Sequence, residues 1–469
     1  MKTTLPNILL IVMDATRVDH VSCYGYHSHT TPNLDTLAAS GIIFENAFAT
    51  SAWTPPSFAS IFSGCYPSMH KVTGKNLVFG DNIASLPQVL SENGYHTACF
   101  STTAWINATR GFDRGFDNFV ETWRRSSRSP KYGLGALLAL GKKFLYGRDK
   151  YTRHLNSSLR HWLSDVRRDD NPFFICAHYH NTHSPYRPPR AFKKKFALSD
   201  ERNYDVRKLL HVSTKAGAYG YMAKKIAVSE AEFDVIKAWY DGELSYMDYH
   251  IGELVSSLKK MGYFENTVLI ITADHGENFG EHGLAFHQFC LYDTLIHVPL
   301  IIVAPSLHKK AARIKTLVSL VDLFSTILDL AGIDTGPYEH IDGRSFASFE
   351  EDSHRDYILA EYQPPDTILN ILRTRYPDFD YSLYQRSMRC VRTREYKFIR
   401  YSDGQEEFYD MIHDPLENNN LIGHGIGAEE DLGSILSDWE VRFNEDDVEV
   451  RTPEEDKEIR KKLELLGYL

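Results

Sequence analysis

Near its N-terminus the chain carries a continuous apolar run, Asn7-Ile8-Leu9-Leu10-Ile11-Val12-Met13, that ends at Asp14. An unbroken run of this length is typical of a parallel strand that is buried on both faces of a sheet. A second run, Val268-Leu269-Ile270-Ile271-Thr272, is followed by Asp274 and His275. Because ligands bind beyond the carboxyl ends of strands in open α/β sheets, these two runs predict a site at one sheet edge.

A hydroxyl residue, Thr54, stands before Pro55, Pro56 and a short apolar stretch. Proline is favoured at the first helical position and threonine just before it caps free amides, so a helix is predicted to start here. The free amides and the helix dipole favour an anion, and this helix start could present Thr54 to a phosphate or sulfate. Taken alone, the stretch fits an ordinary capped helix equally well.

Two aspartates and a histidine at strand ends, together with a hydroxyl at a helix start, predict a metal site. Carboxylate and imidazole ligands favour a first-row ion such as Mn or Zn, and Mg or Ca remain alternatives.

Short motifs follow one another in a fixed order over roughly 400 residues. They are Asp14–His20, Cys23–Tyr26, Thr31–Asp35, His183–Tyr186, Tyr246–Asp248, Asp274–Glu277, Gly280–Gly283, Val298–Ile301, Asp342–Ser345, Phe408–Asp410 and Asp414-Pro415. In this order the chain resembles the sulfatase family of the alkaline phosphatase superfamily. The resemblance implies an α/β fold with a large mixed, mostly parallel sheet flanked by helices, and a small C-terminal antiparallel α+β subdomain.

Sulfatases carry a Cys-x-Pro-Ser-Arg motif whose cysteine, or serine in some members, becomes formylglycine. Two stretches compete for this place, Cys65-Tyr66-Pro67-Ser68-Met69 and Thr54-Pro55-Pro56-Ser57-Phe58. Only the second is followed in the family's register by Ile61-Phe62 and Ser63-Gly64. The resemblance therefore assigns the nucleophile position to Thr54 and makes Cys65 a coincidental match.

This assignment changes the expected chemistry. Formylglycine hydrate forms a sulfate ester and expels sulfate by reforming its aldehyde, which a threonine cannot do. Thr54 could instead attack phosphorus and give a phosphothreonine that water or an acceptor alcohol resolves. Superfamily phosphodiesterases, pyrophosphatases and phosphoglycerol or phosphoethanolamine transferases resemble this arrangement. A threonine hydroxyl is weakly acidic, so it needs direct metal coordination near neutral pH.

The resemblance implies one firmly held divalent ion. Its expected ligands are Asp14, Thr54, Asp274 and His275. Ala15 occupies the place of a second metal-binding aspartate, and Phe58 replaces the arginine that supports formylglycine. A second ion would need further ligands, for which His183 and His287 are the available candidates.

If they do not bind a second ion, His183 and His287 are interpreted as catalytic residues that contact the substrate or serve as a general acid. Ordinary loop histidines are the alternative, in a chain with 21 histidines. Three weaker candidates are His70, Asn107 and His282.

The composition fits an enzyme with a large core, since 43% of its 469 residues are hydrophobic. The formal net charge of −10 argues against a general nucleic-acid binder. No apolar segment reaches transmembrane length, and six scattered cysteines show neither metal spacing nor a disulfide framework. We therefore expect a cytoplasmic protein that acts on an anionic phosphate or sulfate ester. The substrate could be polymeric or lipid-linked, and the protein could form a homo-oligomer.

The alternation of apolar strands and amphipathic helices predicts a catalytic α/β domain over residues 1–350, with a variable lid insertion at about 120–235. A C-terminal subdomain is expected over residues 351–469, with strands at Cys390–Arg392 and Tyr396–Tyr401 and a surface helix at Pro453–Leu469. Basic clusters fall in the insertion, at Arg124–Arg128, Lys193–Lys195 and Lys224-Lys225. They fit a solvated helical lid, or else a surface for an anionic polymer, a lipid headgroup or a second subunit.

Three functions remain open from the sequence. The favoured one is a metal-dependent phosphodiesterase or phosphotransferase that uses Thr54, with phosphonate esters as a related substrate class. The second is a sulfuric ester hydrolase, working without formylglycine or modifying Cys65. The third is a non-catalytic binding protein on a sulfatase scaffold.

Overall fold

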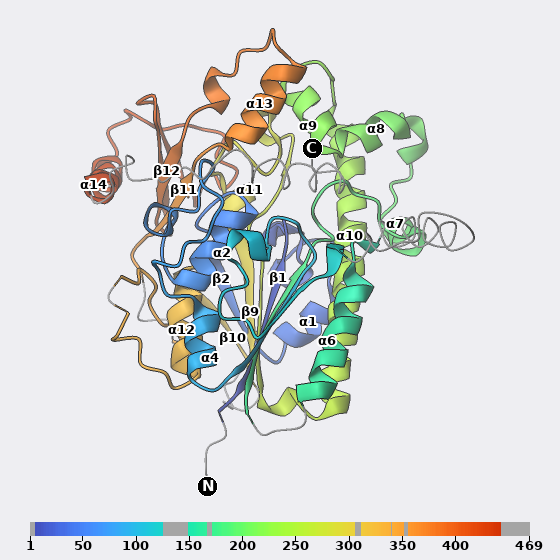
Figure 1. Ribbon diagram of the computed structural model, residues 1–469. Helices are drawn as coiled ribbons and strands as arrows, with labels where there is room; N and C mark the ends of the chain where they lie inside the picture. Colours follow the sequence, from blue (N-terminus) through green and yellow to red (C-terminus); the bar gives the residue numbers. More distant parts are fainter. Residues whose placement is uncertain are drawn as a thin grey trace.

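The computed structural model describes residues 5–124, 149–166, 171–304, 311–338, 340–350 and 355–441. An eight-stranded sheet runs through the molecule with helices on both sides (Figure 1), in the strand order β10-β2-β9-β6-β1-β5-β3-β4. Its strands are β1 (Asn7–Met13), β2 (Ile42–Phe48), β3 (His96–Ser101), β4 (Asn118–Glu121), β5 (Phe173–Tyr179), β6 (Thr267–Thr272), β9 (His297–Val303) and β10 (Ala312–Ser319). Only β9 runs antiparallel to its neighbours. The predicted mixed, mostly parallel sheet is confirmed.

The two apolar runs of the sequence form the adjacent central strands. β1 pairs in parallel with β6 on one side and with β5 on the other. Every residue of the three strands is buried, which explains why the runs carry no polar alternation. In register, Val12 lies opposite Thr272 and opposite His178. The residues that follow these three strand positions therefore meet at one edge of the sheet.

Two helical layers cover the sheet (Figure 1). One contains α2 (Thr54–Ser63), α4 (Leu86–Glu92) and α12 (Asp322–Leu330), which contact one another. The other contains α1 (Pro32–Ala38), α6 (Thr152–Val166) and the long α10 (Glu230–Met261), which starts at a Ser229 capping box and ends at Gly262. The described residues also form the shorter helices α3 (Pro67–His70), α7 (Arg190–Lys195), α8 (Val206–Val212), α9 (Lys215–Met222), α11 (Asp293–Ile296) and α13 (Asp366–Arg375).

A second, four-stranded antiparallel sheet is formed by β11 (Ile358–Tyr362), β12 (Met388–Arg392), β13 (Tyr396–Tyr401) and β14 (Glu406–Asp410). α14 (Gly427–Val441) packs on β12 and β13. A two-stranded ribbon, β7 (Asn278–Phe279) with β8 (Ala285–Phe286), lies beyond β6 in sequence. The expected small C-terminal antiparallel sheet is thus present, while the domain division at residue 350 and the limits of the lid insertion stay predictions.

Some expectations fall on residues outside the described ranges, namely most of the Arg124–Arg128 cluster and the Pro453–Leu469 helix. Of the other basic clusters, Lys193 pairs with Glu201 at 2.7 Å, and Lys195 donates to the His29 carbonyl at 2.8 Å. Lys224 and Lys225 are exposed.

Among the described residues, no helix is both long and apolar enough to cross a membrane.

A buried ion cluster joins the C-terminal sheet to the main sheet. Lys397 of β13 is 0% exposed and contacts Asp293 of α11 at 2.9 Å and Glu417 at 2.7 Å. Burial alone would lower the pKa of Lys397, but the two carboxylates raise it above its usual value, and burial raises the pKa of Glu417 to about 7. The ammonium therefore compensates two carboxylates that have left water.

Replacing this lysine should destabilise the whole fold. We expect Lys397→Met to cost about 3–5 kcal/mol, because it removes the cation that contacts Glu417 and leaves Asp293 with Arg392, at 3.3 Å. Lys237→Met is the matched control, since Lys237 pairs with Asp234 at 3.1 Å on the surface and should cost less than about 1 kcal/mol. Urea denaturation of both variants measures the difference, and equal losses would contradict the assigned role of the cluster.

Candidate metal centre and active site

Two carboxylates meet at the carboxyl edge of the central strands. Asp14 follows β1 and Asp274 follows β6 by two positions, and both are 0% exposed. Asp274 Oδ1 accepts hydrogen bonds from the backbone amides of Ala15 at 3.2 Å and His275 at 3.0 Å. Among the described residues, Asp274 Oδ2 and Asp14 Oδ1 have no hydrogen-bond partner. Each carboxylate therefore presents one unsatisfied oxygen.

His275 faces these two oxygens. Its Nε2 lies 3.5 Å from Asp14 Oδ1 and 3.6 Å from Asp274 Oδ2. Its Nδ1 lies 2.8 Å from the Gly276 carbonyl, which fixes the proton on Nδ1 and leaves the Nε2 lone pair directed at the carboxylates. A backbone acceptor on the far ring nitrogen is the usual support of a metal-binding histidine.

Thr54 begins α2 and brings its hydroxyl to the same point. Thr54 Oγ1 lies 3.2 Å from His275 Nε2. The helix is capped by Trp53, without a side-chain hydrogen bond, so the expectation that Thr54 caps the helix is wrong. Its hydroxyl is consequently available to the site rather than to the helix backbone.

The start of this helix also offers fewer free amides to an anion than expected. Pro55 and Pro56 have no amide hydrogen, and the Ser57 amide is bonded to the Trp53 carbonyl at 3.4 Å. An anion beside Thr54 would therefore be held by side chains and metal more than by the helix start.

Cys65 lies beyond the other end of α2, after the Gly64 cap. Since a helix rises about 1.5 Å per residue, the two ends of α2 are about 15 Å apart. The Cys65 thiol is buried against the His340 carbonyl at 3.1 Å, and burial raises its pKa to about 12. The cysteine is thus remote from the two carboxylates.

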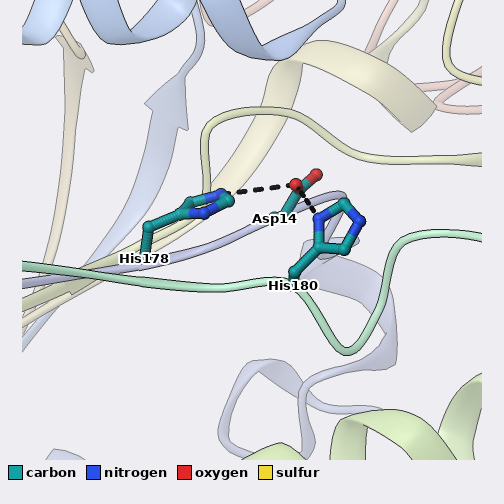
Figure 2. Close-up of side chains that lie close together, drawn as sticks. All are labelled: Asp14, His178 and His180. Carbon is teal, nitrogen blue, oxygen red and sulfur yellow. Dashed lines mark hydrogen bonds and ion pairs between the residues drawn. The ribbon is translucent and has the colours of Figure 1, made fainter. Parts of the chain in front are cut away.

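Two histidines that sequence reasoning missed contact Asp14 from β5 and the turn after it. His178 Nε2 lies 3.3 Å and His180 Nδ1 lies 2.5 Å from Asp14 Oδ2, and Figure 2 shows both rings directed at this one oxygen. Positions 178 and 180 share a face because strand side chains alternate. That alternation is the signal in the sequence by which the two histidines could have been found.

The pKa of Asp14 falls well below its usual value. Burial would raise it, but the neighbouring His180 and His183, and the contacts that His178 and His180 make with the carboxylate, outweigh burial. Burial raises the pKa of Asp274 to about 6, with Asp14 adding to the increase and His275 opposing it. The site therefore holds one carboxylate that is strongly stabilised as an anion and one that a cation would stabilise further.

His183 and His287 line the same region, and each packs against one of the histidines that face the carboxylates. The His183 ring centroid lies 4.2 Å from that of His180, and the His287 centroid lies 4.4 Å from that of His275. The two rings are 4.7 Å apart. His183 Nδ1 lies 2.8 Å from the Ser184 carbonyl, which orients the ring.

His287 differs from His183 in its support, since its Nδ1 lies 3.3 Å from Glu277 Oε1. Burial lowers the pKa of both histidines well below the usual value. Neither belongs to the groups of metal-ligand atoms that lie within 4.8 Å of one another, which are Asp14 with His178 and His180, and Asp14 with Asp274 and His275.

Lys215 is a further buried residue at this site that sequence reasoning missed. It begins α9, is 8% exposed and lies 5.1 Å above the ring of Phe286, which in turn contacts His183 and His287. Burial lowers its pKa to about 7, against the raising effect of Glu277. Nothing local in the sequence marks it as a site residue.

The two departures from the sulfatase pattern have visible places. Ala15 has a positive φ of 52°, and its backbone amide donates a hydrogen bond to Asp274 Oδ1. The ring of Phe58 packs edge-on against that of His178 at 5.1 Å.

The three weaker candidates lie elsewhere or act structurally. His282 is exposed and 3.2 Å from the Leu416 carbonyl. Asn107 caps the 3-10 turn Ala108–Arg110 by accepting from the Arg110 amide at 3.1 Å. His70 is buried between the Val72 amide and Ser60 Oγ, both at 3.0 Å.

The residues at the sheet edge fit a divalent cation. Two buried carboxylate oxygens without partners and an imidazole nitrogen with a fixed lone pair converge with a hydroxyl oxygen. Buried charges without compensation are costly, so a donor set of this kind is stabilised by a cation. Mixed carboxylate and imidazole donors suit Mn or Zn.

The family profile described as sulfatase matches residues 6–333, more than half of the chain. The chain belongs to the sulfatase family. Members are metal-dependent ester hydrolases, and a second profile, the C-terminal part of N-sulphoglucosamine sulphohydrolase, matches residues 280–432.

Relatives in the sulfatase family are distant but nearly full-length. The uncharacterised sulfatase YidJ of Escherichia coli (strain K12) is 24% identical over 89% of this chain and 83% of its own. The N-acetylglucosamine-6-O-sulfatase of Bacteroides thetaiotaomicron is 25% identical over 95% of this chain and 88% of its own. The phosphonate monoester hydrolase of Agrobacterium radiobacter superposes with a TM-score of 0.71 at 22% identity, over 93% of this chain and 95% of that chain. The last comparison supports the fold alone.

The structural role of His70 predicts a specific pH dependence of stability. Its Nδ1 accepts from Val72, so the folded ring is neutral, and burial lowers its pKa from 6.5 to about 3. The unfolded chain binds the proton at the higher pKa, so this contribution is complete above pH 6.5 and is lost as the pH falls toward 3. The full loss is on the order of 4 kcal/mol.

Urea midpoints of wild type and His70→Asn across this pH window test the assignment. The variant should be less stable at neutral pH, and its stability should fall less steeply with acid. His161→Asn, at a side chain that is 83% exposed, should keep the wild-type slope. A wild-type slope in the His70 variant would contradict a neutral buried ring.

Proposed function

We propose that the protein is a metal-dependent hydrolase or transferase that cleaves a phosphate diester or phosphonate ester through Thr54. The observation that carries the proposal is the position of the Thr54 hydroxyl, 3.2 Å from His275 Nε2 and beside the unsatisfied oxygens of Asp14 and Asp274. A nucleophile, a metal-binding donor set and a strand-end site are thereby combined at one point.

The identity of residue 54 favours phosphorus over sulfur. Threonine cannot be converted to an aldehyde hydrate, so the route by which formylglycine expels sulfate is closed to it. A phosphothreonine, by contrast, can be resolved by attack of water or an alcohol at phosphorus. Cys65, at the far end of α2, cannot reach the same donor set.

Asp14, Asp274, His275 and Thr54 would hold the ion. When bound, the ion lowers the pKa of the Thr54 hydroxyl and neutralises charge that develops on the phosphoryl oxygens.

The chain's own residues account for the covalent step. Thr54, having lost its proton to solvent, attacks phosphorus with Oγ1, and the bond from phosphorus to the leaving alcohol breaks as the new bond forms. The product of this half-reaction is Thr54 esterified by the phosphoryl or phosphonyl group, which still carries the substituent that did not leave. Attack by water or an acceptor alcohol then breaks the threonine ester and restores the hydroxyl.

His183 is placed to move the proton of the leaving and entering groups. Its Nδ1 is bound to the Ser184 carbonyl, so proton exchange occurs at Nε2. Burial lowers its pKa in the free protein, but a bound anionic ester adds negative charge that raises it. His183 would protonate the leaving oxygen in the first half-reaction and accept a proton from water in the second.

Lys215 and His287 would contact the non-reacting oxygens. Lys215 lies over Phe286 near both histidines, within a largely apolar wall where a cation attracts an anion strongly. The Glu277 carboxylate orients the His287 ring. The cytoplasmic location expected from the sequence, like the homo-oligomer, stays a prediction.

A sulfuric ester hydrolase is the second candidate. It is favoured by the near full-length similarity to the N-acetylglucosamine-6-O-sulfatase. Such an enzyme would have to pass sulfate through Thr54 or dispense with a covalent intermediate. The substrate comparison below separates the two candidates.

Substitution of Thr54 should abolish phosphoryl transfer. We expect Thr54→Ala to lower kcat for aryl phosphodiesters and phosphonates by about 10³-fold or more, because the attacking oxygen is removed. Thr54→Ser retains that oxygen and should keep measurable turnover. Rates with Mn or Zn are to be compared for diesters, monoesters, phosphonates and sulfates, with mass spectrometry of the Thr54 peptide after rapid acid quenching.

The expected mass in wild type is Thr54 carrying the phosphoryl group with its remaining aryl substituent, or the phosphonyl group with its carbon substituent. Sulfate ester cleavage that survives Thr54→Ala would defeat the proposed nucleophile and favour the second candidate. Cys65→Ser, which changes only the remote thiol, is the matched control and should leave all rates near wild type.

The proton-transfer role of His183 predicts a dependence on the leaving group. His183→Gln should lower kcat by about 10²–10⁴-fold for alkyl esters and much less for nitrophenyl esters, whose leaving group needs no proton. His413→Gln, at an exposed ring, serves as the control. Equal losses for both ester types would show that His183 only positions the substrate.

A further inference from the structure

We infer that Asp14, His178 and His180 form a second divalent-cation site, joined to the first through the Asp14 carboxylate. The inference rests on the proposed function only for the place of the first ion. No sequence motif pointed to these two histidines, and His183 and His287 were the expected ligands of any second ion.

The carboxylate of Asp14 is divided between two sets of neighbours. Its Oδ1 faces His275 Nε2 at 3.5 Å. Its Oδ2 faces His178 Nε2 at 3.3 Å and His180 Nδ1 at 2.5 Å. In Figure 2 the second oxygen of Asp14 projects away from both rings. A carboxylate placed in this way can bind one cation with each oxygen.

His178 is the strongest single indication of a ligand. Its side chain is 0% exposed, and among the described residues neither of its ring nitrogens has a hydrogen-bond partner. A buried polar group without a partner destabilises the fold. Metal coordination through Nε2 would satisfy the nitrogen that faces Asp14, which packing against Phe58 cannot do.

The three residues also have the chemistry of a cation site. One ligand atom from each of Asp14, His178 and His180 lies within 4.8 Å of the others, and all three side chains are buried. Two imidazoles and a carboxylate are the protein ligands of many catalytic zinc sites, which leave one position open for water or substrate. Mn accepts the same donors.

The alternative is that both histidines only donate hydrogen bonds to orient Asp14. In that case His178 Nε2 would donate to Asp14 Oδ2 across 3.3 Å, and His180 Nδ1 across 2.5 Å. Neither histidine would then change the number of bound ions when it is replaced. The metal count of the His178 and His180 variants separates this alternative from a cation site.

A second ion would extend the chemistry of the site. Paired ions about 3.5–4 Å apart stabilise the attacking and the leaving oxygen of an in-line displacement together. The donors for the pair come from three adjacent strand ends, β1, β5 and β6, so the sheet itself would set their separation.

The test counts metal ions on the full-length protein. Apo protein loaded with Mn is freed of excess metal, and the bound metal is measured by mass spectrometry and electron paramagnetic resonance. Wild type should bind two ions per chain with the broadened spectrum of a coupled pair. His178→Phe and His180→Gln should each bind one ion with the spectrum of an isolated Mn.

The substitution of His178 was chosen to preserve folding. Phenylalanine keeps an aromatic ring against Phe58 but removes one partner of Asp14, so thermal unfolding of apo His178→Phe is measured first to establish that the variant is folded. His180→Gln removes the other imidazole ligand and so tests the site independently of His178. His161→Phe, at an exposed ring, is the control and should keep two ions.

One ion per chain in wild type, whether or not the His178 variant retains it, would overturn the inference. The result is independent of turnover. Two bound ions without Thr54-dependent ester cleavage would count against the proposed function alone, and Thr54-dependent cleavage with one ion would count against this inference alone.

Discussion

The buried carboxylate of Asp14 is the constraint on which the site depends. It ends the central strand of the large sheet, where no part of the side chain reaches water. Removing an anion from water is costly unless polar partners replace the solvent. The two flanking strands supply those partners as imidazoles, His275 after β6 and His178 with His180 at the end of β5. Sheet order thus determines which side chains can compensate this charge.

The same geometry explains which parts of the molecule could be predicted from the sequence. The central strands were evident because runs such as Asn7–Met13 are apolar at every position, which only a strand covered on both faces requires. Asp14, Asp274, His275 and Thr54 were found because motif order places them beyond strand ends or at a helix start. His178 was missed because it lies within β5, where a polar residue breaks the pattern that defined the strand. Lys215 comes from a distant insertion, and no local pattern connects it to the sheet edge.

Helix α2 shows how local expectations can be wrong while the assignment of the site holds together. Threonine before two prolines predicts a capping hydroxyl, but the cap falls on Trp53 and the hydroxyl of Thr54 faces His275. The prolines also remove the amides that would have bound an anion. Because this helix start has neither free amides nor a side-chain cap, the Thr54 hydroxyl interacts with the metal-binding side chains at the sheet edge instead. Its reactivity would then be set by the cation that those donors hold, rather than by the helix.

The apolar side chain of Phe58 is compatible with a cation at His178. Residues 54 and 58 are four apart on α2 and share a helix face, so both face the sheet edge. The ring of Phe58 lies 5.1 Å from that of His178. A guanidinium at this place would bring a positive charge against any cation bound by His178, whereas an apolar ring does not. An apolar residue at position 58 therefore leaves both oxygens of Asp14 able to bind a cation.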